Sequence, residues 1–300
     1  MRASESAGQR VGESAEKPLA PGLYLVATPI GNLEDMTLRA LRVLRSVDRI
    51  ACEDTRQTAK LLGHFGITTP TVSYHLHNET SRASELVEAL KAGGRIAVVS
   101  DAGMPGIADP GEAIAAEAIA AGVDVFPIPG ANAALSALIA SGLSAERFAF
   151  HGFLPSKEGA RRTFLEEMRS RMVADGEAVT RIVYETPHRV VGALDDVVAV
   201  FGAAHRVVLA RELTKLHEEF LRGSAGELLK VLQGRDSVRG EMVLLLSGEV
   251  AVSEAQTTAA EDVAALVRSG VAEKDALKQV AKERGVGKSE LYREWQRVKR

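Results

Sequence analysis

The chain has 300 residues, 46% of them hydrophobic, with a formal net charge of −3 at neutral pH. This length accommodates two domains and a small appendage, and the balanced charge predicts no global attraction to nucleic acid or membranes. Cys52 is the single cysteine, which excludes an internal disulfide and a thiolate metal cluster, and no run reaches the about 18 apolar residues that span a bilayer.

The chain begins with a polar segment, residues 1–17, that lacks the apolar core of a signal peptide. We therefore expect a disordered tail over residues 1–20 and a cytoplasmic protein. The lone cysteine fits such a reducing compartment.

The next part of the chain alternates short apolar runs with amphipathic segments. We expect strands at residues 23–27, 49–52, 95–100 and 123–126, each followed by a helical pattern, among them residues 82–92 and 112–121. Strands that alternate with helices predict a mostly parallel sheet with helices on both faces. This N-terminal α/β domain is expected over residues 21–143.

The second half carries five further strand-like runs. They lie at residues 148–153, 181–185, 207–210, 219–223 and 242–246, and predict a smaller mixed sheet in an α/β domain over residues 144–250. After a linker of small polar residues, the segment 255–300 shows three short helical patterns, at residues 263–267, 275–284 and 288–297. A tight glycine turn joins the last two, so a helix-turn-helix unit and a simple helical cap fit equally well.

The stretch at residues 100–111 stands out among the connections. It follows a predicted strand and holds three glycines, two prolines and two aspartates. A plain strand-to-helix connection takes about two to six residues, whereas ligands bind at the carboxyl ends of strands in α/β sheets. Five other strand ends also carry polar or special residues, so we expect a ligand cleft lined by strand ends.

Several common sites are excluded by their missing motifs. There is no Gly-x-Gly-x-x-Gly after the first strand, no phosphate-binding Gly-Lys-Ser/Thr loop and no Gly-x-Ser-x-Gly nucleophile motif. His75 and His77 lack a third ligand nearby, which favours a surface pair over a metal site. A rigid site with few charges suits a group-transfer enzyme using S-adenosylmethionine: apolar walls take the adenine, Asp101 the ribose hydroxyls, and loop N–H groups the methionine carboxylate.

Five motifs together resemble the ribosomal RNA small subunit methyltransferase I family, the RNA-modifying branch of the tetrapyrrole methylase superfamily. The resemblance covers residues 22–250 and the C-terminal helices. The motifs are Leu-Val-Ala-Thr-Pro-Ile-Gly-Asn at residues 25–32, Glu-Asp-Thr-Arg at 53–56, Ser-Asp-Ala-Gly through Asp-Pro-Gly at 100–111, Tyr-Glu-Thr-Pro-His-Arg at 184–189, and Ala-Arg-Glu-Leu-Thr-Lys at 210–215.

The resemblance implies a tetrapyrrole-methylase-like fold, with two α/β domains, S-adenosylmethionine in the cleft between them, and a small C-terminal helical unit. It also implies a homodimer that methylates the ribose 2′-hydroxyl of a cytidine in the decoding region of 16S ribosomal RNA, on the assembled small subunit and without a metal. The cosubstrate pocket it implies is lined by Thr28, Pro29, Asp101, Gly103, Met104, Ile107, Pro129, Gly130, Ala131, Asn132, Tyr184, Leu213 and Met242, together with Glu185 and Glu241 to Val243. Met104, and the pair Ala131-Asn132, depart from the residues that the family often has, Thr and Pro-Ser.

Three residues are candidates for catalysis. Glu185 and His188 are the nearest candidates for the general base that removes the hydroxyl proton, and Lys215 for stabilising the developing oxyanion. Structural roles remain open for each: Glu185 can orient a loop, His188 can cap a helix, and Lys215 can pair with Glu212 or Glu218.

Two basic segments are candidates for RNA contacts. Lys157, Arg161 and Arg162 lie close together, with a solvated helix face as the alternative. Residues 274–300 hold nine Lys/Arg against four Asp/Glu, a net +5, and there Lys288 and Arg293 are the candidates. Tyr292 and Trp295 are expected in the core of that unit. A methylase of a tetrapyrrole or other small metabolite, and a non-enzymatic nucleic-acid-binding regulator, stay as alternative functions.

Overall fold

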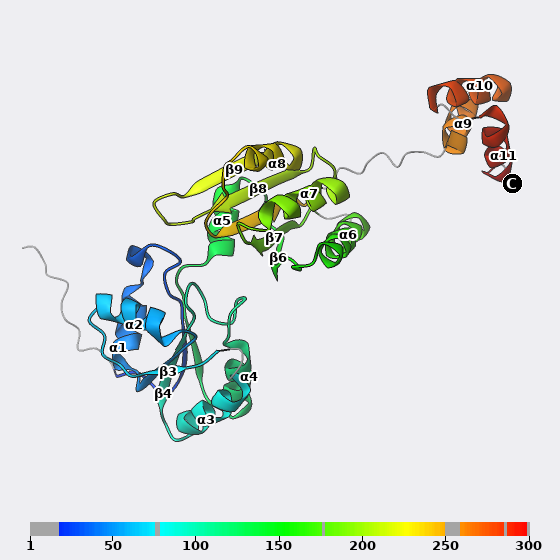
Figure 1. Cartoon of the computed structure of the whole chain (residues 1–300). Helices are drawn as coiled ribbons and strands as arrows, with labels where there is room; N and C mark the ends of the chain where they lie inside the picture. The colour runs from blue at the N-terminus through cyan, green and yellow to red at the C-terminus, as the bar shows by residue number, and fades with distance from the viewer. Residues whose placement is uncertain (1–17, 76–78, 176–177, 250–258, 285–286, 299–300) are drawn as a thin grey trace, which may run out of the picture. The chain divides into compact units, whose positions relative to one another are not determined.

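A computed structural model describes residues 18–75, 79–175, 178–249, 259–284 and 287–298 (Figure 1). The chain divides into two compact units, Met1–Val250 and Ala251–Arg300. The tail expected over residues 1–20 lies, up to residue 17, outside the described residues. None of the described helices is long and apolar enough to cross a membrane.

The first sheet contains five parallel strands in the order β3-β2-β4-β1-β5. In chain order they are β1 (Gly22–Val26), β2 (Arg49–Cys52), β3 (Thr71–Ser73), β4 (Arg95–Val99) and β5 (Val125–Ile128). This confirms the predicted parallel sheet. The short edge strand β3, which has only partly buried residues, was not predicted.

Helices cover both faces of the first sheet, as expected. A short 3-10 helix, η1 (Leu33–Asp35), precedes α1 (Leu38–Ser46) and α2 (Thr55–His64); α3 (Glu79–Lys91) and α4 (Glu112–Ala120) lie on the other side (Figure 1). Because side chains alternate along a strand, Tyr24 and Val26 pack into the core beneath α1 and α2, whereas Leu23 packs into the core beneath α3 and α4.

The second sheet is mixed, with the order β6-β7-β10-β8-β9. Its strands are β6 (Phe148–Phe153), β7 (Thr180–Glu185), β8 (Arg206–Arg211), β9 (Glu219–Ser224) and β10 (Met242–Leu246). Among the neighbouring strands of this sheet, β6 and β7 pair in parallel and the other pairs are antiparallel. The mixed character agrees with the prediction. The expectation of a smaller sheet was wrong, because this sheet also has five strands.

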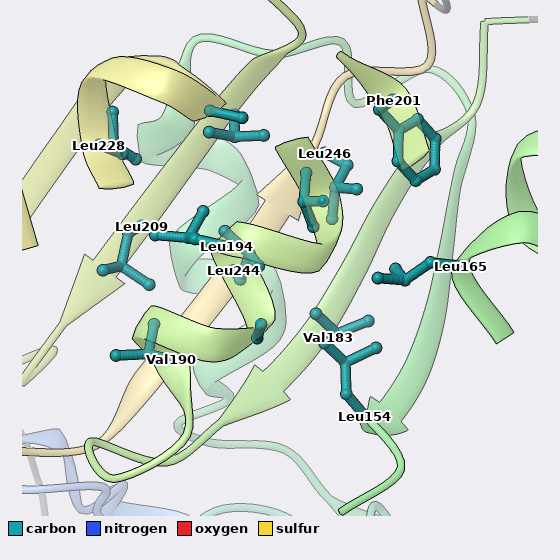
Figure 2. Packing of buried hydrophobic residues seen from close by; sticks show 14 of the residues in the cluster. Leu154, Leu165, Val183, Val190, Leu194, Phe201, Leu209, Leu228, Leu244 and Leu246 are labelled. Carbon is teal, nitrogen blue, oxygen red and sulfur yellow. The ribbon is translucent and has the colours of Figure 1, made fainter. Parts of the chain in front are cut away.

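Two cores flank the second sheet. On one face lie α6 (Glu158–Asp175), α7 (Val190–Phe201) and α8 (Ala225–Gln233); Figure 2 shows their leucines converging on the strand residues Val183, Leu209 and Leu244. On the other face lies α5 (Ala133–Ser141), whose Ala137 and Leu138 pack against Ile182 and Val243. The predicted boundary at residue 143 assigned this helix to the N-terminal half, yet its core contacts are with the second sheet.

The C-terminal unit is a three-helix bundle. It comprises α9 (Ala259–Arg268), α10 (Glu273–Arg284) and α11 (Lys288–Val298), around a core that includes Val263, Val280, Leu291 and Trp295. The prediction that the two aromatic residues are in the core is right for Trp295 and wrong for Tyr292, which is 50% exposed.

His205, in the turn between α7 and β8, is buried against the ring of Phe201 at a centroid distance of 4.8 Å. Neither ring nitrogen has a hydrogen-bond partner among the described residues. Burial, with a smaller contribution from Arg169, lowers the pKa of His205 to about 4. In the unfolded chain the pKa of His205 has its ordinary value of about 6.5. Between about pH 4 and pH 6.5 the imidazole is therefore protonated in the unfolded chain and neutral in the folded protein.

We expect His205 to make the protein acid-sensitive. Its stability contribution is fully present above about pH 6.5 and falls by about 3 kcal/mol as the pH approaches 4. Urea unfolding at about pH 7.5 and about pH 4.5 measures this loss, and His205→Phe should remove most of it. The exposed His217, changed to Phe, is the control; equal acid sensitivity of the two variants would contradict the prediction.

Candidate active site

A cavity of about 400 Å³ lies within the first unit, where the strand ends of both sheets contribute. The first sheet supplies the segments after β1, β2, β4 and β5, and the second supplies β6, β7, the residues after β8 and the start of β10. The lining residues are Ile30, Glu53, Asp101, Ala102, Gly103, Met104, Ile107, Ala108, Asp109, Asn132, Ala133, Phe153, Tyr184, Glu185, Thr186, Pro187, Leu213, Glu241, Met242 and Val243. The predicted cleft lined by strand ends thus corresponds to a described cavity.

The loop at residues 100–111 is tied to the end of β1. Thr28 and Gly103 exchange two backbone hydrogen bonds, of 2.9 and 3.1 Å, and the Thr28 hydroxyl donates to the carbonyl of Ser100 at 3.1 Å. Gly103 has φ of +84°, a conformation that favours glycine. Thr28 is buried and lies outside the cavity lining. Its hydrogen bonds therefore fix the loop whose residues 101–104 line the cavity.

Strained backbone gathers at this cavity. Three non-glycine residues of the described chain have left-handed φ: Ala108 at 61°, Glu212 at 51° and Thr214 at 65°. Ala108 lines the cavity, and the other two flank Leu213, which also lines it. Such conformations cost about 1–3 kcal/mol each and cluster where a binding surface requires them.

Three carboxylates from two loops give the cavity a negative character. Burial, together with repulsion from Glu53 and Asp101, raises the pKa of Asp109 to about 6. Burial and the charge of Asp101 also raise the pKa of Glu53. Asp101 is exposed and accepts a 3.2 Å hydrogen bond from the backbone N–H of Asp54. These groups favour a positively charged ligand; in the described part of the chain no group of His, Cys, Asp and Glu has an arrangement suited to a metal ion.

Glu185 is the most deeply buried charged group of the lining, with a fully buried side chain. Its Oε1 accepts from the N–H of Thr186 at 2.8 Å and from Nε and Nη2 of Arg189 at 2.7 and 2.6 Å. Its Oε2 is buried and has no partner among the described residues. An unpaired buried carboxylate oxygen is costly, so this atom is available to a donor that enters the cavity.

Aromatic side chains form part of the wall on the second sheet. Tyr184 packs edge-on against Phe150 and Phe153, at centroid distances of 4.8 and 5.5 Å. Burial raises the pKa of the Tyr184 hydroxyl. Phe153 remains half exposed and lines the cavity. Together with Ile30, Met104, Ile107, Leu213 and Met242, the rings of Phe153 and Tyr184 give the cavity an apolar part of its lining.

The structure brings together eight of the thirteen predicted cosubstrate residues. Those in the lining are Asp101, Gly103, Met104, Ile107, Asn132, Tyr184, Leu213 and Met242; those outside it are Thr28, Pro29, Pro129, Gly130 and Ala131. Close packing explains the glycine at position 130, because a Cβ there would lie 2.8 Å from the Cβ of Ala27. Asn132 lines the cavity and also caps α5 by accepting from the N–H of Leu135.

Of the three catalytic candidates, only Glu185 lines the cavity. His188 is exposed and borders a second groove. The Lys215 ammonium donates to Oε1 of Glu212 at 2.8 Å and to Oε2 of Glu241 at 3.0 Å. The pairing with Glu212 was one of the structural alternatives, and it leaves Lys215 holding the cavity residue Glu241.

Sequence reasoning missed several lining residues. Glu53, Asp109, Thr186 and Pro187 belong to the recognised motifs, and their position at strand ends was the available signal. No such signal marks Phe153 in the sequence, because it lies beside Tyr184 only through the pairing of β6 with β7.

The basic segment of α6 differs from the prediction. Arg161 is buried, and its guanidinium pairs with Asp196 of α7 at 2.8 Å; Arg162 is partly exposed and pairs with the same carboxylate. Because it is buried and paired, Arg161 has a structural role, and its prediction as an RNA contact is corrected. Lys157 precedes α6 and is exposed. Arg293 is exposed on α11, whereas the Lys288 side chain lies outside the described part of the structure.

Comparisons with known proteins agree on one family. Residues 22–229 match the model of the Tetrapyrrole (Corrin/Porphyrin) Methylases. The chain is 47% identical to the ribosomal RNA small subunit methyltransferase I of Halalkalibacterium halodurans, over 90% of this chain and 93% of that protein, and 45% identical to the Bacillus subtilis protein of the same name, over 90% and 92%. A crystal structure of diphthine synthase has the same fold, with a TM-score of 0.58 at 17% identity over 75% of this chain and 89% of that one.

Proposed function

Because the chain belongs to the tetrapyrrole methylase family, and within it to the ribosomal RNA small subunit methyltransferases I, we propose that it methylates the ribose 2′-hydroxyl of a cytidine in the decoding region of small-subunit ribosomal RNA, with S-adenosylmethionine as the methyl donor. The membership predicted from five motifs is confirmed, and the chain is a methyltransferase. The relatives' names favour this substrate over a tetrapyrrole and over a regulatory role without catalysis.

The cavity's donor set fits S-adenosylmethionine. Its apolar lining residues, which include Ile30, Met104 and Leu213, suit an adenine ring, and the Asp101 carboxylate suits ribose hydroxyls. The negative charge of Glu53 and Asp109 suits a positively charged sulfonium. When bound, this cosubstrate supplies a methyl group already activated for transfer.

The observation that carries the proposed chemistry is the unpartnered Oε2 of Glu185. A hydroxyl that attacks a methyl group must lose its proton, and the carboxylate of Glu185, a lining residue of the cavity, can accept it. The ion pair with Arg189 and the hydrogen bond from Thr186 fix the carboxylate through its other oxygen. In this proposal Lys215 positions Glu241, with which it forms a hydrogen bond. His188 does not serve as the general base, because it lies outside the cavity lining.

We propose in addition that the protein is a homodimer, acts on the assembled small subunit and works in the cytoplasm. Exposed apolar side chains on α5, Leu135 and Ile139, support a protein–protein contact. Sedimentation of the purified protein measures the dimer, and a monomer at micromolar concentration would contradict it.

The proposed function is tested with labelled S-adenosylmethionine. Small ribosomal subunits that lack the modification, naked ribosomal RNA and a tetrapyrrole are offered separately, and nucleoside mass spectrometry locates the methyl group. We expect label on a ribose of the subunit RNA. A methyl group on a base, or label only on the tetrapyrrole, would refute the proposal.

We expect Asp101→Ala to weaken binding of S-adenosylmethionine by at least about tenfold, because a charge-assisted hydrogen bond contributes about 1.5–3 kcal/mol. Calorimetry measures the affinity, and an unchanged melting temperature serves as the control for folding. Asp124→Ala, at the opposite end of the first sheet, is the matched variant and should bind normally. Wild-type affinity in Asp101→Ala would remove this residue from the site.

Removing residues 255–300 should weaken binding to small subunits and reduce its dependence on salt. The segment 274–300 carries a net charge of +5, and each neutralised phosphate contributes about 0.7–0.9 to the slope of log affinity against log salt. The first unit has hydrophobic cores of its own, so its affinity for S-adenosylmethionine should persist. An unchanged salt slope would assign the RNA contacts elsewhere.

A further inference from the structure

A second groove, of about 580 Å³, shares Pro187 with the active-site cavity. It is formed by the turn after β7, the end of α8 and the loop between α8 and β10. His188, Gln233, Arg235, Ser237 and Arg239 provide polar groups along it. None of these five residues is in the lining of the cavity proposed to bind the cosubstrate.

The two arginines of the groove differ in their surroundings. Arg235 is held by two hydrogen bonds to Glu219, of 2.9 and 2.6 Å, and the same carboxylate also accepts a hydrogen bond from Arg211. Arg239 is exposed, and within the described chain no carboxylate pairs with its guanidinium. The groove also contains one carboxylate, Asp236, which is exposed. Within the described chain, Arg239 therefore presents a positive charge without a carboxylate partner, on a surface that also carries the exposed Asp236.

Both walls of the groove continue into the active site. The turn that carries Pro187 and His188 begins directly after Glu185, and the loop that carries Arg239 runs into Glu241 and Met242 of the cavity lining. The Arg239 carbonyl accepts a 3.3 Å hydrogen bond from Arg211 of β8, which anchors this loop to the sheet. A chain molecule that places one unit in the cavity can therefore extend along the groove without leaving the surface.

We propose that this groove binds the sugar–phosphate backbone of the RNA strand next to the target nucleotide, with Arg239 as the phosphate contact. The inference rests on the proposed function and adds the surface that holds the RNA beside the target nucleotide. The continuity with the cavity and the free positive charge support a polyanion that enters the cavity with one of its units. Gln233 and Ser237 offer hydrogen-bonding groups suited to phosphate and 2′-hydroxyl oxygens.

The test uses steady-state methylation of unmodified small ribosomal subunits by the full chain, at several salt concentrations. Arg239→Ala should raise KM for the subunit about tenfold at low salt and lower the salt slope by about 0.7–1, with kcat nearly unchanged. Arg239→Lys should recover most of the affinity, since a phosphate contact requires only a cation. Arg49→Ala is the matched control, because this exposed arginine starts β2 at the amino end of the first sheet.

Further readouts separate the possible failures. S-adenosylmethionine affinity, measured by calorimetry, should be equal in all variants, and Ser237→Glu provides a second variant that should weaken subunit binding by repulsion. If the wild type methylates subunits and both Arg239→Ala and Ser237→Glu behave like Arg49→Ala, the groove assignment is wrong and the proposed function stands. If the wild type methylates no RNA, the proposed function and the groove assignment are both wrong.

Discussion

Glu185→Gln is expected to lower kcat for methyl transfer by about 10²–10⁴-fold, the usual contribution of a general base. The glutamine side chain has nearly the same shape, so the affinity for S-adenosylmethionine should change little. The reason lies in the asymmetry of the carboxylate: Oε1 is occupied by Thr186 and Arg189, and only Oε2 is free to receive a proton from a ligand in the cavity. Single-turnover methylation of small subunits measures the chemical step directly.

The controls for this prediction come from the other two candidates. His188 and Lys215 lie outside the cavity lining, so His188→Ala and Lys215→Ala should each reduce kcat less than Glu185→Gln does. Glu185→Asp tests the need for a carboxylate, and should retain more activity than Glu185→Gln. The proposal fails if Glu185→Gln methylates at the wild-type rate, or if its loss of activity follows a loss of melting temperature.

Local sequence patterns were sufficient to predict the strands and helices that bury continuous apolar residues. The parallel sheet follows from alternating runs such as residues 95–100, and the cavity-lining loop at residues 100–111 stands out by its glycines and prolines. The edge strand β3 escaped prediction because its three residues are only partly buried and show no strong pattern.

The remaining features depend on contacts between residues far apart in the chain. Nothing local to α5 shows that Leu138 packs against Val243 rather than against the first sheet. The same limit applies to the site: eight of thirteen expected cosubstrate residues line the cavity, whereas Thr28 supports it from behind and Phe153 reaches it through strand pairing. Motifs thus located the cavity, and tertiary packing decided which side chains line it.

Arg161 and Arg162 illustrate how such packing changes an interpretation. Neighbouring basic residues on a helix suggest a surface for RNA, and the sequence offers no local sign of their partner. The partner is Asp196, 35 residues away from Arg161 and 1% exposed, and both guanidiniums bind its carboxylate at 2.8 Å. This pair joins α6 to α7 beside the core of the second sheet, so its function is stability.

Asp196→Ala is therefore expected to destabilise the protein by about 3–5 kcal/mol, because it leaves the buried Arg161 charge without its partner. Urea unfolding measures the loss, and a shift of the midpoint at constant slope would show that native stability changed. Arg162→Ala is the matched control, since this partly exposed arginine leaves the Arg161–Asp196 pair intact, and its effect should be much smaller.

A double variant distinguishes a missing charge from a missing contact. Replacing both partners by apolar residues of similar size, Arg161→Met with Asp196→Leu, removes the unpaired charge and should recover much of the stability lost in Asp196→Ala. Its affinity for small subunits should equal that of the wild type, because Arg161 is buried and paired with Asp196. A double variant as unstable as Asp196→Ala would mean that packing, and not the buried charge, sets the cost, whereas weakened subunit binding in a stable double variant would return Arg161 to the RNA-binding surface.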